Sequence, residues 1–109
     1  MNTKPQDNTD IGYDLEITKM TKRDSAPGTW VHGRIAAHRF QALVFSEHAE
    51  EPEFELGESR ISKLWIQRNA ERKTVCNFDR GWDIQPTDAT VAAIVDFLAE
   101  GLAQYTYRE

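Results

Sequence analysis

Apolar and polar residues alternate near the start of the chain. The alternation runs from Tyr13 to Thr18 and places Tyr13, Leu15 and Ile17 on one side. A period of two is typical of a strand with one buried face. A loop-forming run from Arg23 to Gly28 follows. We therefore expect a first strand that begins with the alternation and ends before this loop.

A second apolar pattern, from Thr29 to Ser46, predicts a hairpin. A turn centred on Ala37 and His38 produces one coherent apolar face. In this register the facing pairs are Val31 with Val44, Gly33 with Ala42, and Ile35 with Phe40. Neither Ala nor His readily adopts the positive φ that Gly or Asn accepts, so a longer loop with the same register remains an alternative. The other face would carry Trp30, His32, Arg34, Gln41, Leu43 and Phe45.

A second hairpin is predicted between Arg60 and Asp79, with its turn at residues 69–72. A three-residue loop creates a clean apolar face that pairs Ile66 with Cys76 and Leu64 with Phe78. The other face then pairs Trp65 with Asn77 and Lys63 with Asp79. The last pair joins opposite charges across two strands, an arrangement that contributes about 0.2–1 kcal/mol.

The end of the chain predicts a helix. Thr87 is the expected N-cap, Pro86 precedes it, and Asp88 follows in the first turn, where a carboxylate opposes the positive helix terminus. An apolar stripe with spacings of three and four comprises Val91, Ile94, Val95, Leu98, Leu102 and Tyr105. We expect the helix to end near Tyr105. Gly101 within it indicates close contact with the sheet, or else a local loosening near the helix end.

These elements predict an α+β fold, an antiparallel β-meander of four to five strands with one C-terminal helix packed across one face. At 109 residues the length fits one domain. Residues 1–10 contain no apolar residue after the initiator Met and are expected to form a disordered tail. Residues 11–109 would then form a single domain.

The sheet face away from the helix is expected to be aromatic. It would carry Trp30, Leu43, Phe45 and Trp65 beside His32, Arg34 and Lys63. A monomer rarely leaves so much aromatic area in water. Three covers are consistent with the sequence: the acidic loop around Phe54 and Leu56, a second subunit in a homodimer, or a partner protein.

Charge is unevenly distributed within the formal net charge of −5. The stretch from Glu47 to Glu58 holds six acids and no base, whereas Ser59 to Arg80 holds six bases against two acids. One interpretation is that the acidic connection partly neutralises the positive electrostatic field of a nearby basic hairpin. The other is a bipolar surface that steers a charged partner. The acidic balance argues against nucleic acid as a partner, although basic residues flank Trp65.

Catalytic and metal-binding patterns are few. Cys76 is expected to be a buried structural thiol, and the three histidines lack metal-ligand spacing. We therefore expect no metal and no cofactor. The single cysteine and the absence of a signal-peptide pattern predict a cytoplasmic protein, and no segment resembles a membrane span.

The run from Asp79 to Asp83 places two acids, Arg80 and Trp82 around a glycine. Asp79 and Asp83 could act together as acid and base. The interpretation that we favour is a salt-bridged junction between strand and helix, formed with Arg80 or a neighbouring base. In that junction the Trp82 ring would close the end of the core.

The run Arg60-Ile61-Ser62-Lys63-Leu64, the turn Asp79-Arg80-Gly81-Trp82-Asp83 and the terminal helix together carry a resemblance. The chain resembles a family of small uncharacterised proteins of bacteria and their phages, whose signature is an R-I-S-K-L strand and a D-R-G-W-D turn. The resemblance covers about the C-terminal two-thirds of the chain. It implies a prophage or mobile-element setting and no activity, and it groups Lys63, Asp79, Arg80, Trp82 and Asp83 in one constellation.

The favoured function is a non-enzymatic protein-binding module, such as a phage inhibitor or adaptor that acts on a host protein. The expected binding residues are Trp30, Phe45, Lys63, Trp65, Asp79, Arg80, Trp82 and Asp83. The alternative is a small enzyme, or a nucleotide- or nucleic-acid-handling domain, that uses Asp79 and Asp83 with His32 or Lys63.

Overall fold

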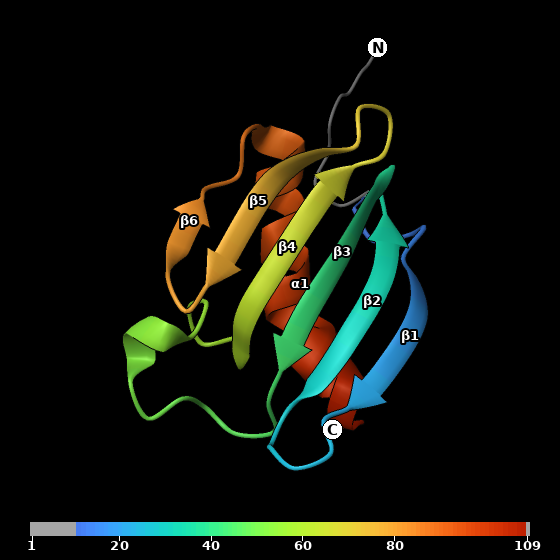
Figure 1. Ribbon diagram of the computed structural model, residues 1–109. Coiled ribbons are helices and arrows are strands. Elements are labelled where there is room, and N and C mark those ends of the chain that lie inside the picture. The colour runs from blue at the N-terminus through green and yellow to red at the C-terminus, as the bar shows by residue number, and fades with distance from the viewer. Residues whose placement is uncertain (1–10, 109) are drawn as a thin grey trace.

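The computed structural model describes residues 11–108, so the predicted N-terminal tail lies outside the described residues. One antiparallel sheet holds six strands in sequence order, and one helix follows it (Figure 1). The elements are β1 (Glu16–Lys22), β2 (Thr29–Ile35), β3 (His38–Val44), the short 3-10 helix η2 (Pro52–Phe54), β4 (Ile61–Arg68), β5 (Lys73–Asp79), β6 (Trp82–Ile84) and α1 (Ala89–Tyr107). The predicted α+β meander with a C-terminal helix is confirmed, with one strand more than expected.

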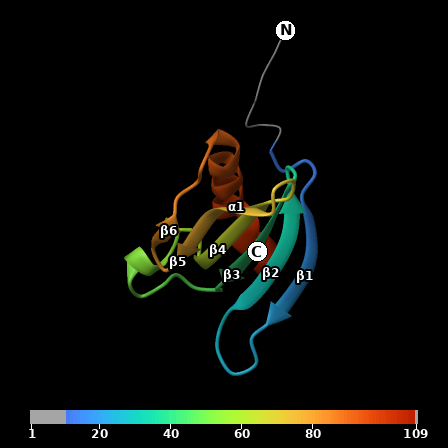
Figure 2. The same ribbon diagram turned by 45° about the horizontal axis from the view of Figure 1, so that its top comes forward.

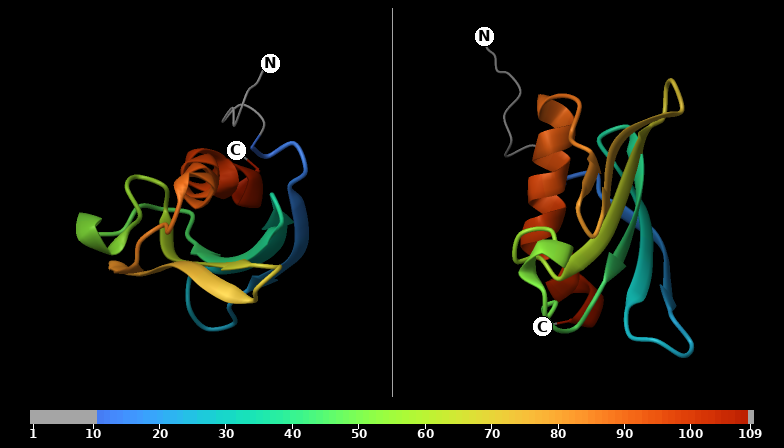
Figure 3. Two further views of the ribbon diagram at one scale, coloured as in Figure 1. Left: turned by 90° about the horizontal axis from the view of Figure 1, so that it is seen from above. Right: turned by 60° about the vertical axis from the view of Figure 1, so that its left-hand side comes forward.

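The core lies between α1 and the concave face of the sheet. Seen from above, the sheet curves around the helix, and a tilted view shows the same curvature (Figures 2 and 3). The helix contacts β2, β3 and β4. Fully buried side chains from both layers meet there, and they include Val31, Phe40, Leu64, Ile66, Val91, Ile94 and Leu98. Burying each such side chain stabilises the fold by about 1.5–3 kcal/mol.

The β2–β3 hairpin has the predicted faces but a different register. Its turn is Ala36 and Ala37, with φ of 51° and 64°, so Ile35 pairs with His38 and Gly33 pairs with Phe40. The prediction that Gly33 faces Ala42 is therefore wrong. The physical reason is packing, because a methyl group on Gly33 would lie 2.8 Å from the Phe40 ring. The ring fills the space that the glycine leaves open.

Two outside contacts hold the strained β2–β3 turn. The carboxylate of Asp14 accepts a hydrogen bond from the Ala36 N–H, with Oδ1 at 3.1 Å. The Asn69 N–H donates to the Ala37 carbonyl oxygen at 3.1 Å. These bonds link the turn to the segment before β1 and to the β4–β5 loop. They compensate for residues that would not favour a two-residue turn on their own.

The predicted register of the β4–β5 hairpin is confirmed from Lys63 to Ile66. Leu64 pairs with Phe78, Trp65 with Asn77, Ile66 with Cys76, and Lys63 with Asp79. Nζ of Lys63 lies 3.6 Å from Oδ1 of Asp79. A register shift between Ile66 and Gln67 then brings Arg68 opposite Lys73, so the loop is residues 69–72 and the predicted three-residue loop is wrong.

The first strand begins later than predicted. Tyr13 is 88% exposed and lies in a turn, whereas Leu15 and Ile17 pack against the core. β1 starts at Glu16 and shifts register between Ile17 and Lys19. This irregularity ends the alternation that the sequence suggested, and most of β1 is exposed.

The helix is capped by Asp88 rather than by Thr87. Oδ1 of Asp88 accepts a hydrogen bond from the Val91 N–H at 2.9 Å. The predicted stripe is buried from Val91 to Leu102, but Tyr105 is 56% exposed. A methyl group on Gly101 would meet no atom within 4 Å, so the expected close contact with the sheet is wrong. No helix in residues 11–108 is long and apolar enough to cross a membrane.

The D-R-G-W-D run forms a hairpin turn into a sixth strand rather than a direct junction between strand and helix. Arg80 and Gly81 have φ of 55° and 146°, and the Asp79 N–H donates to the Gly81 carbonyl at 2.8 Å. The Arg80 N–H donates to the Ser62 carbonyl at 2.8 Å. Trp82 is 41% exposed, so the expectation that its ring closes the core is wrong. A three-residue strand carries too little pattern to be predicted from its sequence.

Candidate functional site

The sheet face opposite α1 is the first candidate site, and we call it the open face. Figure 1 looks onto this face, with α1 behind the sheet. The half-buried indoles of Trp30 on β2 and Trp65 on β4 border a shallow hollow of about 120 Å³. Lys63 and Asp79 line the same hollow. The structure therefore brings four of the predicted binding residues together.

The Trp65 indole is held in place by its neighbours. Its Nε1–H donates a hydrogen bond to Oγ1 of Thr74 at 3.1 Å. The guanidinium carbon of Arg39 lies 5.7 Å from the centre of the indole ring. Nε of Arg39 in turn donates to Oε1 of Gln67 at 3.0 Å. A cation over an indole face at this distance is attractive by about 0.5–1 kcal/mol when exposed, so Trp65 is a preorganised platform.

Leu43 does not contribute to the open face as predicted, because it is only 2% exposed. The β1–β2 loop covers it: a methyl group on Gly28 would lie 3.1 Å from Cδ1 of Leu43. The same loop brings the Arg23 guanidinium to 5.8 Å from the Phe45 ring centre. The aromatic area of this face is therefore smaller than the sequence suggested.

Asp79 and Asp83 have separate partners. Besides Lys63, Asp79 faces Arg80, whose Nε lies 4.0 Å from Oδ1. Oδ2 of Asp83 accepts a hydrogen bond from Nδ2 of Asn77 at 3.2 Å. Asp79 lines the hollow and Asp83 does not. Each carboxylate thus has its own polar partners, and the two do not line the hollow together.

The acidic connection between β3 and β4 does not cover the open face. It lies beside the sheet, near the ends of β4 and β6 (Figures 1 and 3). Leu56 joins the core cluster that includes Val95 of the helix. Phe54 is 42% exposed, and the Arg80 guanidinium lies 5.9 Å from its ring centre. Internal capping of the open face by Phe54 and Leu56 is therefore a wrong expectation.

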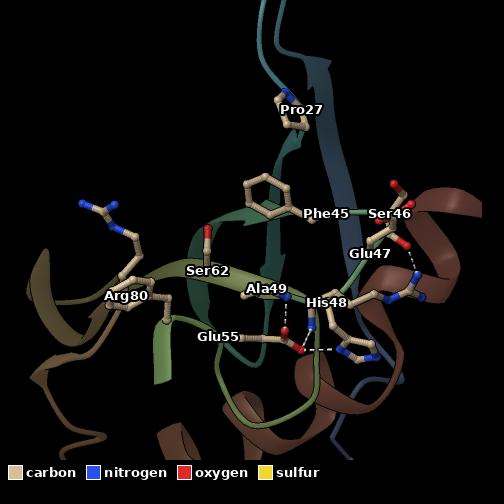
Figure 4. Close-up of a pocket in the computed structure, with 11 residues that line it drawn as sticks. Pro27, Phe45, Ser46, Glu47, His48, Ala49, Glu55, Ser62 and Arg80 are labelled. Carbon is tan, nitrogen blue, oxygen red and sulfur yellow. Dashed lines mark hydrogen bonds and ion pairs between the residues drawn. The ribbon is translucent and has the colours of Figure 1, made fainter. Parts of the chain in front are cut away.

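This connection encloses a second candidate site, a pocket of about 510 Å³. Figure 4 shows Glu55 and His48 on one side and Arg80 on the other, with Phe45 and Pro27 above. The Glu55 side chain is only 4% exposed. Its oxygens accept hydrogen bonds from the Ala49 N–H at 2.7 Å, the Arg60 N–H at 2.8 Å and Nδ1 of His48 at 2.7 Å.

Those three hydrogen bonds determine the ionisation of Glu55. Burial by itself would raise the pKa of its carboxyl, but the bonds from the Ala49 amide, His48 and the Arg60 amide outweigh burial and lower the pKa below its usual value. A carboxylate with this many donors is a poor proton acceptor. Glu55 therefore ties the loop together, and the chemistry offered by the pocket is that of its aromatic wall and the Arg80 guanidinium.

Sequence reasoning missed Glu55 and Arg39 as members of these sites. Glu55 is one of six acids in a run, and only its position between Phe54 and Leu56 hints at burial. Arg39 is one of the face-alternating residues of β3, and its cross-strand position next to Trp65 follows from the register. A correct register for β3 and β4 would have revealed that contact.

The remaining predicted residues are divided between surfaces. Asp83 is hydrogen-bonded to Asn77, which lines the hollow. Phe45 and Arg80 instead line the pocket of Glu55. Trp82 lies on the helix side of the sheet, against the buried Phe78 and in a groove with Val95. The constellation of Lys63, Asp79, Arg80, Trp82 and Asp83 is therefore continuous in sequence but split across two sides of the sheet.

Candidate metal ligands and the Cys76 thiol were the remaining groups with possible chemistry. Within residues 11–108 no group of three or more His, Cys, Asp or Glu side chains could hold a metal ion. Cys76 is fully buried, and burial raises the pKa of its thiol to about 11. The thiol is protonated and inaccessible at neutral pH, in agreement with the predicted structural role.

Comparison with known protein families assigns the chain to one of them. Residues 29–103, well over half of the chain, match the family described as a domain of unknown function (DUF7678). The chain belongs to this family. No curated protein and no solved structure matches the chain. The matched range starts with β2 and ends within α1, so it contains both hairpins, the acidic connection and the β5–β6 turn.

Proposed function

We propose that this protein is a non-enzymatic protein-binding module that contacts its partner through the open face. One observation carries the proposal. Two half-buried indoles, Trp30 and Trp65, border a hollow that the Lys63–Asp79 ion pair also lines, on the sheet face opposite α1. Tryptophan and arginine are enriched among residues that dominate binding energy, and Arg39 completes this set.

The shape of the open face fits a protein rather than a small molecule. Its hollow of about 120 Å³ is well below the roughly 300–1,000 Å³ of a small-molecule pocket. A shallow aromatic centre with charged neighbours has the anatomy of a protein interface. The R-I-S-K-L and D-R-G-W-D runs support a phage or mobile-element inhibitor or adaptor that acts on a host protein in the cytoplasm.

The enzymatic alternative has less support. It requires Asp79 and Asp83 to act on one substrate, yet Asp79 pairs with Lys63 and Asp83 accepts from Asn77. The same alternative requires a concave pocket into which both carboxylates open. Asp79 lines the hollow of the open face, whereas Asp83 does not line it.

The proposal is tested by affinity capture from a bacterial lysate followed by binding of the purified partner. Trp65→Ala and Trp30→Ala should each weaken the captured complex by about tenfold or more, as expected for central interface residues. Tyr105→Ala is the matched control, because this exposed aromatic side chain lies on α1, behind the open face. A partner that binds the wild type and the Trp65→Ala variant equally, or no partner at all, would contradict the proposal.

A further inference from the structure

A groove on the helix side of the sheet is separate from the open face. It lies between β6 and α1, has a volume of about 440 Å³, and is open to solvent. Trp82, Val95 and Ala99 supply its apolar surface, and Glu58, Asp96 and Glu100 supply its charge. The groove contains no Lys or Arg among its lining residues.

The Trp82 indole is exposed but fixed in orientation. Its ring centre lies 5.2 Å from that of the buried Phe78, at an interplanar angle of 76°. Edge-to-face contacts of this kind contribute about 0.5–1.5 kcal/mol beyond the area they bury. The indole is 41% exposed, so it can still receive a ligand without rearranging its support.

The three carboxylates are poorly compensated. Glu58, Asp96 and Glu100 are exposed and take part in no ion pair with another residue in the described part of the chain. Asp96 and Glu100 are also four residues apart on one helix, where like charges repel by about 0.2–0.5 kcal/mol. By contrast, the acids Glu16, Glu71 and Asp88 each pair with an arginine. A cation in the groove would relieve this repulsion.

We propose that the groove binds a lysine or arginine side chain presented by another protein. The charged head meets the carboxylates of Asp96 and Glu100 and the face of the Trp82 indole. The aliphatic stem lies along Val95 and Ala99, as long basic side chains commonly do on apolar surfaces. The site is independent of the open face, so the protein presents two binding surfaces on opposite sides of one sheet.

Titration of the labelled full-length protein with hexalysine tests the proposal, with the indole and backbone amide signals followed by NMR. The signals of Trp82, Val95 and Ala99 should move, while the indole signal of Trp65 on the other face should not. Hexalysine acetylated on every side chain should leave all of them unchanged. Higher ionic strength should weaken the binding, because exposed charge pairs are screened.

Two charge-matched double variants separate a specific site from general attraction to an acidic protein. Asp96→Asn/Glu100→Gln should weaken hexalysine binding about tenfold, the loss expected for two exposed charge contacts. Asp24→Asn/Glu50→Gln removes the same charge elsewhere and should retain the wild-type affinity. Equal weakening by both variants, movement of Trp65 in place of Trp82, or binding of the acetylated peptide would overturn the proposal.

Discussion

Nδ1 of His48 donates a hydrogen bond to Oε2 of Glu55 at 2.7 Å, and this contact closes the connection between β3 and β4 on itself. The histidine is exposed and the carboxylate is buried. The Ala49 and Arg60 amides on either side of Glu55 donate to the same carboxylate. An otherwise irregular acidic segment is therefore organised around one of its own acids, with the backbone supplying most of the donors.

Glu55→Gln should destabilise the protein by about 1–3 kcal/mol near neutral pH, because an amide nitrogen would face buried N–H donors. The pKa of Glu55 is lowered in the folded state. Its contribution is thus fully present above the unfolded-state pKa and is lost as pH falls through the folded-state pKa. Urea denaturation should show the difference between wild type and variant shrinking in acid.

The control for Glu55 is Glu53→Gln, an exposed acid in the same connection. It should leave the free energy of unfolding within about 0.5 kcal/mol of the wild type. Equal stability of the two variants at neutral pH would show that the buried carboxylate does not hold the loop.

Ala37→Gly should stabilise the protein. Ala37 is exposed and has a φ of 64°, a conformation that costs a residue with a Cβ about 1–2 kcal/mol. Glycine removes that cost, but it also raises the conformational entropy of the unfolded state, which offsets part of the stabilisation. A net increase of about 0.5–1 kcal/mol in the free energy of unfolding is therefore expected. Thermal and urea denaturation measure it.

Ala92→Gly provides the opposite case with the same chemical change. Ala92 lies in the first turns of α1, where glycine costs about 1 kcal/mol relative to alanine. If both variants lower the stability, the turn does not require a left-handed conformation at Ala37.

Trp82→Ala should cost only about 1–2 kcal/mol, because the indole is half-exposed and its main loss is the edge contact with Phe78. Phe78→Ala should cost about 3–5 kcal/mol, since that ring is buried in the core. Chemical denaturation of the two variants compares the partners directly. A larger loss for Trp82 than for Phe78 would mean that the indole is part of the core after all.

The open face also leads us to expect a homodimer in the absence of a partner. Two copies packed through Trp30 and Trp65 would cover the aromatic surface in a twofold arrangement. Sedimentation at micromolar concentration should detect a dimer that Trp65→Ala weakens. A single monomeric species at every salt concentration would contradict this expectation, and the open face would then be free for another protein.

Local pattern was sufficient for several parts of the structure. The β4–β5 register from Lys63 to Ile66 followed from one apolar face, and its Lys63–Asp79 pair formed as predicted. The buried stripe of α1 followed from its helical spacing. These features depend on residues close in sequence, where side-chain period and turn preference act directly.

The β2–β3 register depended on a contact between strands. The pattern of faces was correct because a shift by two residues preserves them. The choice between the two registers was made by Phe40, whose ring lies over Gly33. Outside hydrogen bonds from Asp14 and Asn69 then supported a turn that its own alanines would not favour.

By itself the sequence determined the α+β meander, the helix that follows it and the residues that face the core, because these depend on periodicity. Only the tertiary structure decided which side of the sheet each functional residue occupies. Trp82 lies four residues from Phe78 and three from Asp79, yet the turn at Arg80 and Gly81 directs its indole to the helix side. Glu55 is buried because three donors from separate positions converge on it, and no periodic pattern encodes such a convergence.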